Sequence, residues 1–150
     1  MRQVWFILLM AGIAFAQNKG PGGTVVPAQE AREKIKAPEG FKVTLFGAEP
    51  DIVQPIATCI DDRGRLWVAQ CLSYPKWAEK GNDSILIFED HDGDGKFDKR
   101  TVFADNLNYL TGLQISSDGV YVASAPNLLY FEDKNRDDKP DGPPKILLDG

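Results

Sequence analysis

The feature that most constrains this chain is an internal repeat. The stretch ATCIDDRGRLWVAQ at residues 57–70 recurs in outline as GLQISSDGVYVAS at 112–124. ILIFEDHDGDGKFD at 85–98 recurs as LLYFEDKNRDDKPD at 128–141. Each unit contains two strands around an aspartate-containing turn, then a third strand and an acidic loop. A chain that repeats in this way builds similar modules, and each module buries its apolar faces against its neighbours.

The repeated modules are built from strands. Short apolar or alternating runs are separated by turn residues, and the periodicity of a long helix does not occur after residue 40. Four strands recurring about every 40–50 residues predict an all-β fold, a β-propeller with about two blades in residues 38–150. Because a closed propeller has about 4–8 blades, we expect the chain to be the N-terminal part of a longer protein. The expected strands are 41–47, 55–60, 65–70, 84–90 and 100–105, their counterparts in the second unit, and 145–150 as the last strand, with Trp67 and Tyr121 in the core.

The residues before the repeat have the features of a targeting segment. Residues 1–16 contain one basic side chain, an apolar run and an A-x-A-like end, which is typical of a cleaved secretory signal peptide. An uncleaved N-terminal anchor is the alternative, although the run is shorter than the roughly 20 residues that span a bilayer. Residues 17–37 are rich in Gly, Pro and polar residues and predict a flexible leader, with a short helical turn that ends before Pro38. We therefore expect an exported protein of the bacterial periplasm or cell surface, with any membrane association provided by other parts of the protein.

Composition and motifs limit the chemistry. The formal net charge is −5 and no basic stripe runs along the chain, which argues against nucleic acid as a partner. Cys59 lies near the turn of one predicted hairpin and Cys71 at its far end, too far apart for a disulfide with each other, so we expect two free thiols or pairing with other parts of the protein. The motifs GxSxG, HExxH, GxGxxG and CxxCH do not occur, so no catalytic residue and no site of c-type haem attachment can be named.

The acidic loop after the third strand has the spacing of a calcium loop. In an EF-hand the ligands fall at positions 1, 3, 5, 7 and 9, with glycine at 6 and a bidentate glutamate at 12. Here position 6 is Gly95, but position 12 is Thr101. An Asp- and Gly-rich turn that needs no metal is the alternative reading. The candidate metal ligands are Asp90, Asp92, Asp94, Lys96 through its carbonyl, and Asp98, and the weaker second set is Asp133, Asn135, Asp137 and Asp141, where Asp138 replaces the glycine.

Loop positions predict where a ligand would bind. In a propeller blade the loops joining strands one to two and three to four lie on one face, so the acidic loops should lie on the face opposite the ligand site, with His91 an exposed turn residue. The connections 71–83 and 105–112 then lie at the mouth of the channel. Their aromatic and amide side chains could stack on a flat cofactor or a sugar, or could simply cover the end of the blade. The ligand-face candidates are Tyr74, Lys76, Trp77, Asn106, Asn108, Tyr109 and Thr111.

Several of these motifs together resemble a known family. The segments PEGF, AEP, GRLWVA, DHDGDGKFD and TVFADNLNYLTG resemble the opening of the membrane-bound dehydrogenase family of Planctomycetes and Verrucomicrobia, whose members are similar to glucose/sorbosone dehydrogenase propellers. The resemblance covers about residues 28–150. It implies a quinoprotein-like dehydrogenase that holds pyrroloquinoline quinone, oxidises a sugar or alcohol and passes electrons to an acceptor. In some members a haem-binding cytochrome c domain follows.

Two other functions fit the same residues. A non-catalytic propeller could bind glycans or proteins at the cell surface. A calcium-dependent hydrolase of the lactonase type would need acidic side chains that face inward, and the acidic loops are expected on the opposite face.

Overall fold

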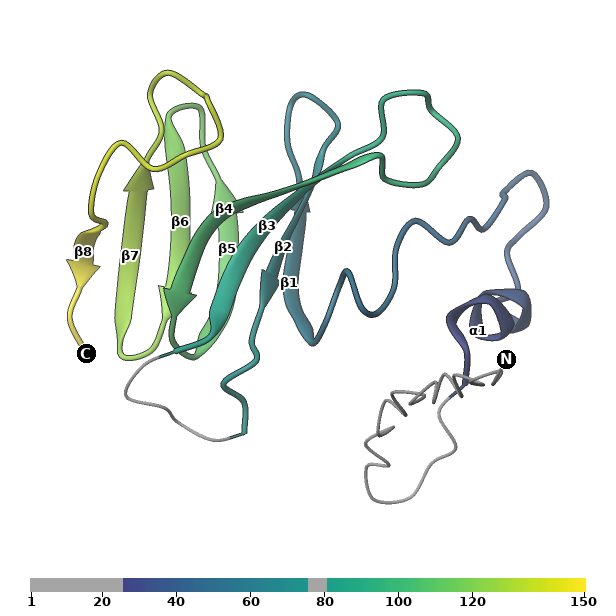
Figure 1. Ribbon diagram of the computed structural model, residues 1–150, viewed down its shortest axis with the longest axis horizontal. Helices are drawn as coiled ribbons and strands as arrows, with labels where there is room; N and C mark the ends of the chain where they lie inside the picture. Colours follow the sequence, from purple (N-terminus) through teal and green to yellow (C-terminus); the bar gives the residue numbers. More distant parts are fainter. Residues whose placement is uncertain (1–25, 76–80) are drawn as a thin grey trace, which may run out of the picture.

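The computed structural model describes residues 26–75 and 81–150, so the predicted signal peptide and the first part of the leader lie outside the described residues. The described chain forms one short helix and two four-stranded antiparallel sheets (Figure 1). This confirms the all-β prediction. The elements are α1 Ala28–Lys34, β1 Pro55–Ile60, β2 Leu66–Gln70, β3 Asp83–Glu89, β4 Lys99–Leu107, β5 Leu110–Ile115, β6 Gly119–Ser124, β7 Asn127–Glu132 and β8 Lys145–Leu148.

Each sheet is a simple meander. In sheet A the strands follow the order β1-β2-β3-β4, and in sheet B the order β5-β6-β7-β8. The repeated residues hold equivalent places in the two sheets, because Phe88 pairs with Leu66 in sheet A and Phe131 pairs with Val120 in sheet B. The observed strand boundaries agree with the predicted ones within a few residues, since alternating apolar runs and turn residues are local signals.

A single apolar layer lies between the sheets. Sheet A contributes Trp67, Ile85 and Ile87, and sheet B contributes Val120 and Val122, all of them buried. Full burial of one such side chain contributes roughly 1.5–3 kcal/mol, so this layer is the main source of contact energy between the sheets. It also places β1 and β5, the first strands of the two sheets, next to each other.

The other face of sheet A is covered by the chain that precedes it. Phe46 and Ile52 pack on a cluster that contains Leu86 and Phe88. The predicted strand 41–47 is therefore wrong as a strand, because this segment forms no regular ladder. A backbone bond from the Phe97 amide to the Phe46 carbonyl, at 3.4 Å, links it to the loop between β3 and β4. The alternating pattern correctly indicates that side chains of this segment pack on the sheet. It does not indicate whether the backbone pairs with a neighbouring strand.

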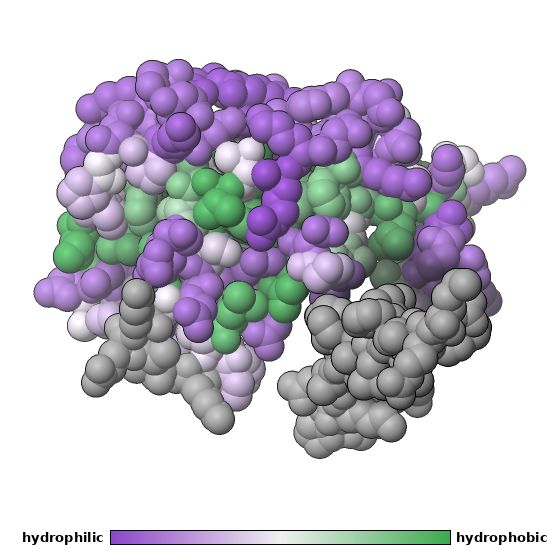
Figure 2. Space-filling view, viewed as in Figure 1, coloured by the Kyte–Doolittle hydropathy of each residue, from purple (hydrophilic) through white to green (hydrophobic). Residues whose placement is uncertain are grey.

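The outer face of sheet B has no cover among the described residues. Tyr121, predicted to be core, is 40% exposed and stacks at a tilt on Tyr130, with ring centroids 4.6 Å apart. The prediction is wrong because the side chain points away from sheet A, toward the side where no further element packs. Leu148 on the edge strand is also exposed. Figure 2 shows apolar residues across the middle of the molecule, below a hydrophilic rim of loops.

The N-terminal leader is partly helical. Helix α1 runs over Ala28–Lys34 and starts directly after Pro27, so the predicted helical turn is present but lies a few residues earlier than expected. An ion pair between Lys34 and Glu30, at 2.6 Å, stabilises its exposed face. None of the described helical residues belongs to a segment that is long and apolar enough to cross a membrane.

Candidate functional site

The loops of the two sheets gather at opposite ends. The turns after β1 and β5 and the acidic loops after β3 and β7 lie at one end, at the top of Figure 1. Residues 71–75 after β2 and the connection between β4 and β5 lie at the other end. The structure therefore places the acidic loops away from the predicted ligand face, as the order of strands requires.

A cleft of about 290 Å³ lies at the end that was predicted to bind a ligand. It opens between the start of β1 and the junction of β4 with β5. Its walls are mainly apolar and aromatic, with a few polar groups from side chains. This composition suits a small molecule with an apolar face and a polar edge. The lining residues are Gln54, Pro55, Ile56, Cys71, Tyr74, Tyr109, Leu110 and Thr111.

Two tyrosines form an aromatic corner in this cleft. The rings of Tyr74 and Tyr109 have centroids 6.3 Å apart and planes inclined by 54°. Tyr74 is 60% exposed, so one face of its ring is open to solvent. Tyr109 has a positive φ of 52°, a conformation uncommon for a bulky residue. Strained backbone of this kind is often found at ligand sites, because the surrounding contacts hold it in place.

The cleft brings together three of the seven predicted ligand-face residues, Tyr74, Tyr109 and Thr111. Lys76 and Trp77 lie outside the described residues. Asn106 belongs to strand β4 and its amide bonds the neighbouring Asp105, so the predicted loop 105–112 is mostly strand. Asn108 accepts a bond from the Ser124 hydroxyl through its carbonyl and does not line the cleft.

Sequence reasoning missed other residues of the cleft and of its support. Gln54 and Cys71 line the cleft, and they are joined by a bond from the Cys71 amide to the Gln54 carbonyl at 3.1 Å. Cys71 is buried and Cys59 half-buried, and both are free thiols in the structure. No local signal marks these residues as cleft residues, because they meet only when β1 pairs with β2.

Asp83 holds together the two segments that form the cleft. This carboxylate is fully buried and accepts bonds from the Ser73 amide at 2.7 Å, the Ser73 hydroxyl at 2.8 Å and the Leu110 amide at 3.0 Å. The Ser73 hydroxyl oxygen in turn accepts a bond from the Tyr109 amide at 3.0 Å. One carboxylate thus ties the connection after β2 to the junction of β4 and β5. These are the two segments that carry Tyr74 and Tyr109.

The first acidic loop brings three carboxylates together at the other end. One carboxylate oxygen from each of Asp90, Asp92 and Asp98 lies within 4.8 Å of the other two. Among residues 26–75 and 81–150, this is the one group of three acidic, histidine or cysteine side chains close enough to share a metal ion. Two ligands of one calcium ion at 2.3–2.6 Å are at most about 5 Å apart, so the three oxygens fit a shared ion. Asp94 is not in the group, and its side chain accepts a bond from the Lys96 amide.

Backbone amides bind the same side chains. Asp90 accepts bonds from the amides of Gly93 and Gly95, at 2.8 and 2.9 Å. His91 is exposed, as predicted, and its ring nitrogen lies 3.4 Å from Glu89. These bonds would also hold the loop in shape as a turn without metal.

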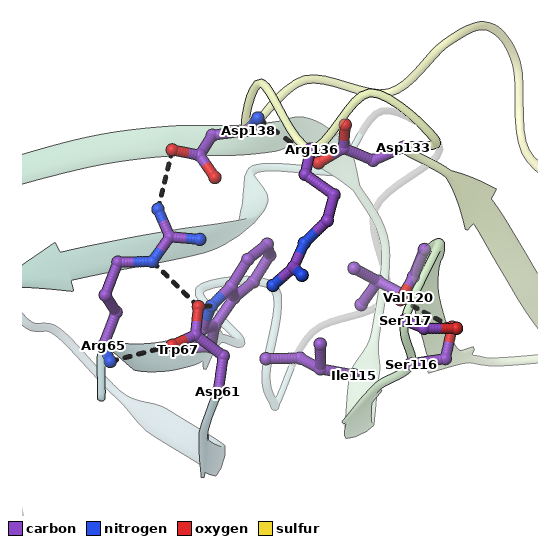
Figure 3. A pocket seen from close by; sticks show the side chains of 11 residues that line it. Asp61, Arg65, Trp67, Ile115, Ser116, Ser117, Val120, Asp133, Arg136 and Asp138 are labelled. Atoms are coloured by element: carbon purple, nitrogen blue, oxygen red, sulfur yellow. Dashed lines mark hydrogen bonds and ion pairs between the residues drawn. The ribbon is translucent and has the colours of Figure 1, made fainter. Parts of the chain in front are cut away.

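A buried ion network lies beside the second acidic loop (Figure 3). The Arg65 guanidinium donates to Asp61 at 2.8 Å and to Asp138 at 2.7 Å, and the Trp67 indole also donates to Asp61 at 3.0 Å. Burial by itself lowers the pKa of Arg65, but the two carboxylates outweigh it and raise the pKa above its ordinary value. Asp61 and Arg65 lie in the turn between β1 and β2 of sheet A and Asp138 in the loop after β7 of sheet B, so the network crosses between the sheets.

Comparison with known proteins gives a family. The chain belongs to a family described as a domain of unknown function, DUF7133, whose model matches residues 27–150. The match begins just before α1 and includes both sheets. No curated protein and no solved structure matches the chain.

Removal of the Asp83 carboxylate should strongly destabilise the protein. An Asp83→Ala substitution leaves three buried donors without an acceptor, and each unsatisfied group costs about 1–3 kcal/mol, so we expect a loss of roughly 3 kcal/mol or more. Asp83→Asn keeps one acceptor and should lose less. Urea unfolding measures the free energies, with the exposed Asp105→Ala as control. Equal, small losses for Asp83→Ala and Asp105→Ala would contradict this role.

Asp61 should make stability depend on pH in the acid range. Burial raises the pKa of its carboxyl, but hydrogen bonds from Trp67 and Arg65 outweigh this and hold the pKa below its usual 3.8. A depressed pKa in the folded state stabilises the protein above the unfolded pKa, and this stabilisation is lost as the pH falls through the folded value.

The free energy of unfolding of the wild type should therefore fall toward that of Asp61→Asn as the pH is lowered below about 4. Chemical denaturation of both proteins from pH 7 to pH 2 measures the difference. A difference that stays constant over this range would show that Asp61 does not titrate with a depressed pKa.

Proposed function

We propose that the two sheets are successive blades of a β-propeller. Three observations support this: the two four-stranded meanders have the same register, they pack face to face through one apolar layer, and their inner strands β1 and β5 are neighbours. Each blade of a propeller is a four-stranded sheet of this kind, arranged around a central channel. In this arrangement the exposed apolar side chains on the outer face of sheet B, including Tyr121, pack against a following blade.

The propeller binds a small, ring-shaped neutral molecule in the cleft beside Tyr74 and Tyr109. The observation that carries this proposal is the cleft itself, of about 290 Å³, with an aromatic corner and the polar side chains Gln54 and Thr111 at its wall. Tyrosine rings stack on the apolar face of a sugar or other ring, and amide and hydroxyl groups bond its polar edge. Asp83 holds the two tyrosine-bearing segments in place before the ligand arrives.

The resemblance of the sequence to membrane-bound dehydrogenases extends the proposal to a reaction. In the complete protein, the ligand is a sugar or alcohol that is oxidised, with its electrons passed to an acceptor. Export to the periplasm or cell surface follows from the same resemblance and from residues 1–16. A cytochrome domain elsewhere in the protein would supply haem.

The cleft fits one part of pyrroloquinoline quinone and not the rest. The quinone is a flat tricarboxylate, and the tyrosines suit its ring face. Its carboxylates need basic partners, and none of the described residues that line the cleft is a lysine or an arginine. We therefore derive no step through this cofactor, and the sugar or alcohol is the ligand that the described cleft suits.

A binding function without catalysis uses the same observations. The aromatic corner is as suitable for a glycan held at the cell surface as for a substrate. A lactonase-type hydrolase has less support, because the described carboxylate cluster lies at the end opposite the cleft.

The first acidic loop binds calcium in a structural role. The close carboxylates of Asp90, Asp92 and Asp98 support this proposal. A bound ion would neutralise the mutual repulsion of these side chains, and would stabilise the folded state by an amount that grows with the logarithm of the calcium concentration above the dissociation constant. Because the loop joins β3 to β4 far from the cleft, the ion stabilises the outer edge of the sheet and does not contact the ligand.

Ligand binding is tested by calorimetry with D-glucose on the purified full-length protein. Tyr74→Leu keeps an apolar side chain and removes the ring, and we expect it to weaken binding about tenfold, the equivalent of about 1.4 kcal/mol. Phe41→Ala is the matched control, because Phe41 is an exposed aromatic residue outside the cleft. Unchanged affinity in Tyr74→Leu would show that glucose does not bind at this corner.

The same preparation separates oxidation from binding. Reduction of an artificial electron-acceptor dye upon addition of glucose supports a dehydrogenase. Binding without dye reduction supports a glycan-binding propeller.

Calcium should raise the melting temperature of the wild type and not that of an Asp92→Ala/Asp94→Ala variant. At a calcium concentration of 100 times the dissociation constant, one site adds about 2.7 kcal/mol of stability. Calorimetry measures binding and thermal melts measure the stabilisation, with Asp105→Ala as a control that keeps the loop intact. If calcium shifts the melting temperature of neither protein, the loop is a turn that is stabilised by its own hydrogen bonds.

A further inference from the structure

The two acidic loops share one backbone arrangement. Asp98 donates its amide to the Glu89 carbonyl at 2.7 Å, and Asp141 donates to the Glu132 carbonyl at 2.8 Å. The first aspartate of each loop accepts a bond from the amide five residues later, at 2.9 Å in the first loop and 3.2 Å in the second. The loops therefore differ in their side chains and not in their course.

The difference lies at the two positions with positive φ. In the first loop these are Gly93 and Gly95, with φ of 75° and 86°. In the second loop they are Arg136 and Asp138, with φ of 57° and 68°. Glycine adopts this conformation without steric cost, whereas aspartate and above all arginine adopt it less readily, so both substitutions strain the second loop. A loop that served only as a turn would be better formed with glycine.

Both strained residues contact the turn between β1 and β2 of sheet A. Asp138 bonds the Arg65 guanidinium at 2.7 Å and lies 3.9 Å from that of Arg63. Arg136 pairs with Asp62 through its side chain, and its carbonyl accepts a bond from Arg63 at 3.2 Å. Figure 3 shows Asp138 and Arg136 extending from the loop of sheet B toward Arg65 and Trp67.

Within this contact, the ion pair of Arg65 and Asp138 is shielded from solvent. The side chain of Arg65 is 9% exposed, and those of Asp61 and Asp138 are 3% and 14% exposed. The guanidinium thus lies between two carboxylates on the side of its own sheet, Asp61 at 2.8 Å and Glu89 at 4.0 Å, and one carboxylate from the loop of the next sheet. The pair of Arg136 and Asp62 is more exposed, with 38% and 67%, and contributes less because solvent screens it.

We propose that the second acidic loop is a latch between the sheets and that its cation is the Arg65 guanidinium of sheet A, in place of a metal ion. Through Asp138 the loop recognises one arginine at one position, which fixes the register of sheet B against sheet A. The strain at Asp138 is the consequence of placing a carboxylate where the first loop has Gly95. This role goes beyond the ligand function and does not depend on it.

An Asp138→Gly substitution separates the latch from a simple turn. It restores the residue of the first loop and relieves the positive φ. If Asp138 is only a turn residue, the melting temperature of the full-length protein should stay the same or rise. If Asp138 is the latch, Arg65 loses its partner across the sheets, and the melting temperature should fall by about 4 °C or more. A rise or no change overturns the proposal.

Arg136→Gly is the matched control, because it relieves the same strain in the same loop and removes the exposed pair. We expect its melting temperature to change by no more than about 2 °C. A double-mutant cycle of Arg65→Met with Asp138→Gly then measures their coupling: the fall caused by Asp138→Gly should be smaller when Arg65 is already absent. Equal falls in both backgrounds would show that the two residues do not act together, against the latch.

Calcium binding provides a second test of whether the cation of the second acidic loop is Arg65. The number of calcium ions bound per chain, measured by calorimetry, should be the same for the wild type and for Asp133→Asn. A site lost in Asp133→Asn would identify the second loop as a metal site and overturn the assignment of Arg65 as its cation.

Discussion

The arrangement of this protein depends on the apolar layer between its two sheets. A chain of edge-to-face aromatic contacts runs through that layer, from Trp67 to Phe103 at 5.0 Å between ring centroids and from Phe103 to Phe131 at 6.2 Å. Because the layer sets β1 beside β5, it also brings together the segments that form the cleft at one end and the ion network at the other. The cleft and the ion network are both consequences of how the sheets pack.

At each end of the two packed sheets, one buried charged side chain holds the loops in place. At the cleft, Asp83 is satisfied by neutral donors from two segments, so it positions backbone without needing a cation. At the opposite end, Arg65 is bracketed by carboxylates from both sheets. A buried charge is tolerated only when it is paired or fully hydrogen-bonded, which makes each of these groups specific for one arrangement of its neighbours. The cleft beside Tyr74 and Tyr109 and the acidic loops therefore lie at opposite ends of the sheets and differ in chemistry.

Much of the fold could be predicted from the sequence, and the site only in part. The strands and the placing of the acidic loops away from the cleft follow from local alternation, turn residues and strand order. Tyr74, Tyr109 and Thr111 were found by their position in the connections. The strand at 41–47 and the burial of Tyr121 were predicted wrongly, because an alternating pattern does not tell which neighbour covers a face. Gln54, Asp83 and the pairing of Arg65 with Asp138 gave no local signal.

By itself, therefore, the sequence determined the repeated strand–turn–strand modules and the backbone course of the two acidic loops, since aspartate and glycine at fixed spacing dictate a turn through short-range hydrogen bonds. The contacts between the two modules, in contrast, depend on the packing of the folded chain. Residues far apart in the chain, such as Arg65 and Asp138 or Ser73 and Tyr109, meet when the sheets pack. The physical reason is that burial of the shared apolar layer sets their distances, and no local preference of the backbone encodes which distant residue will be there.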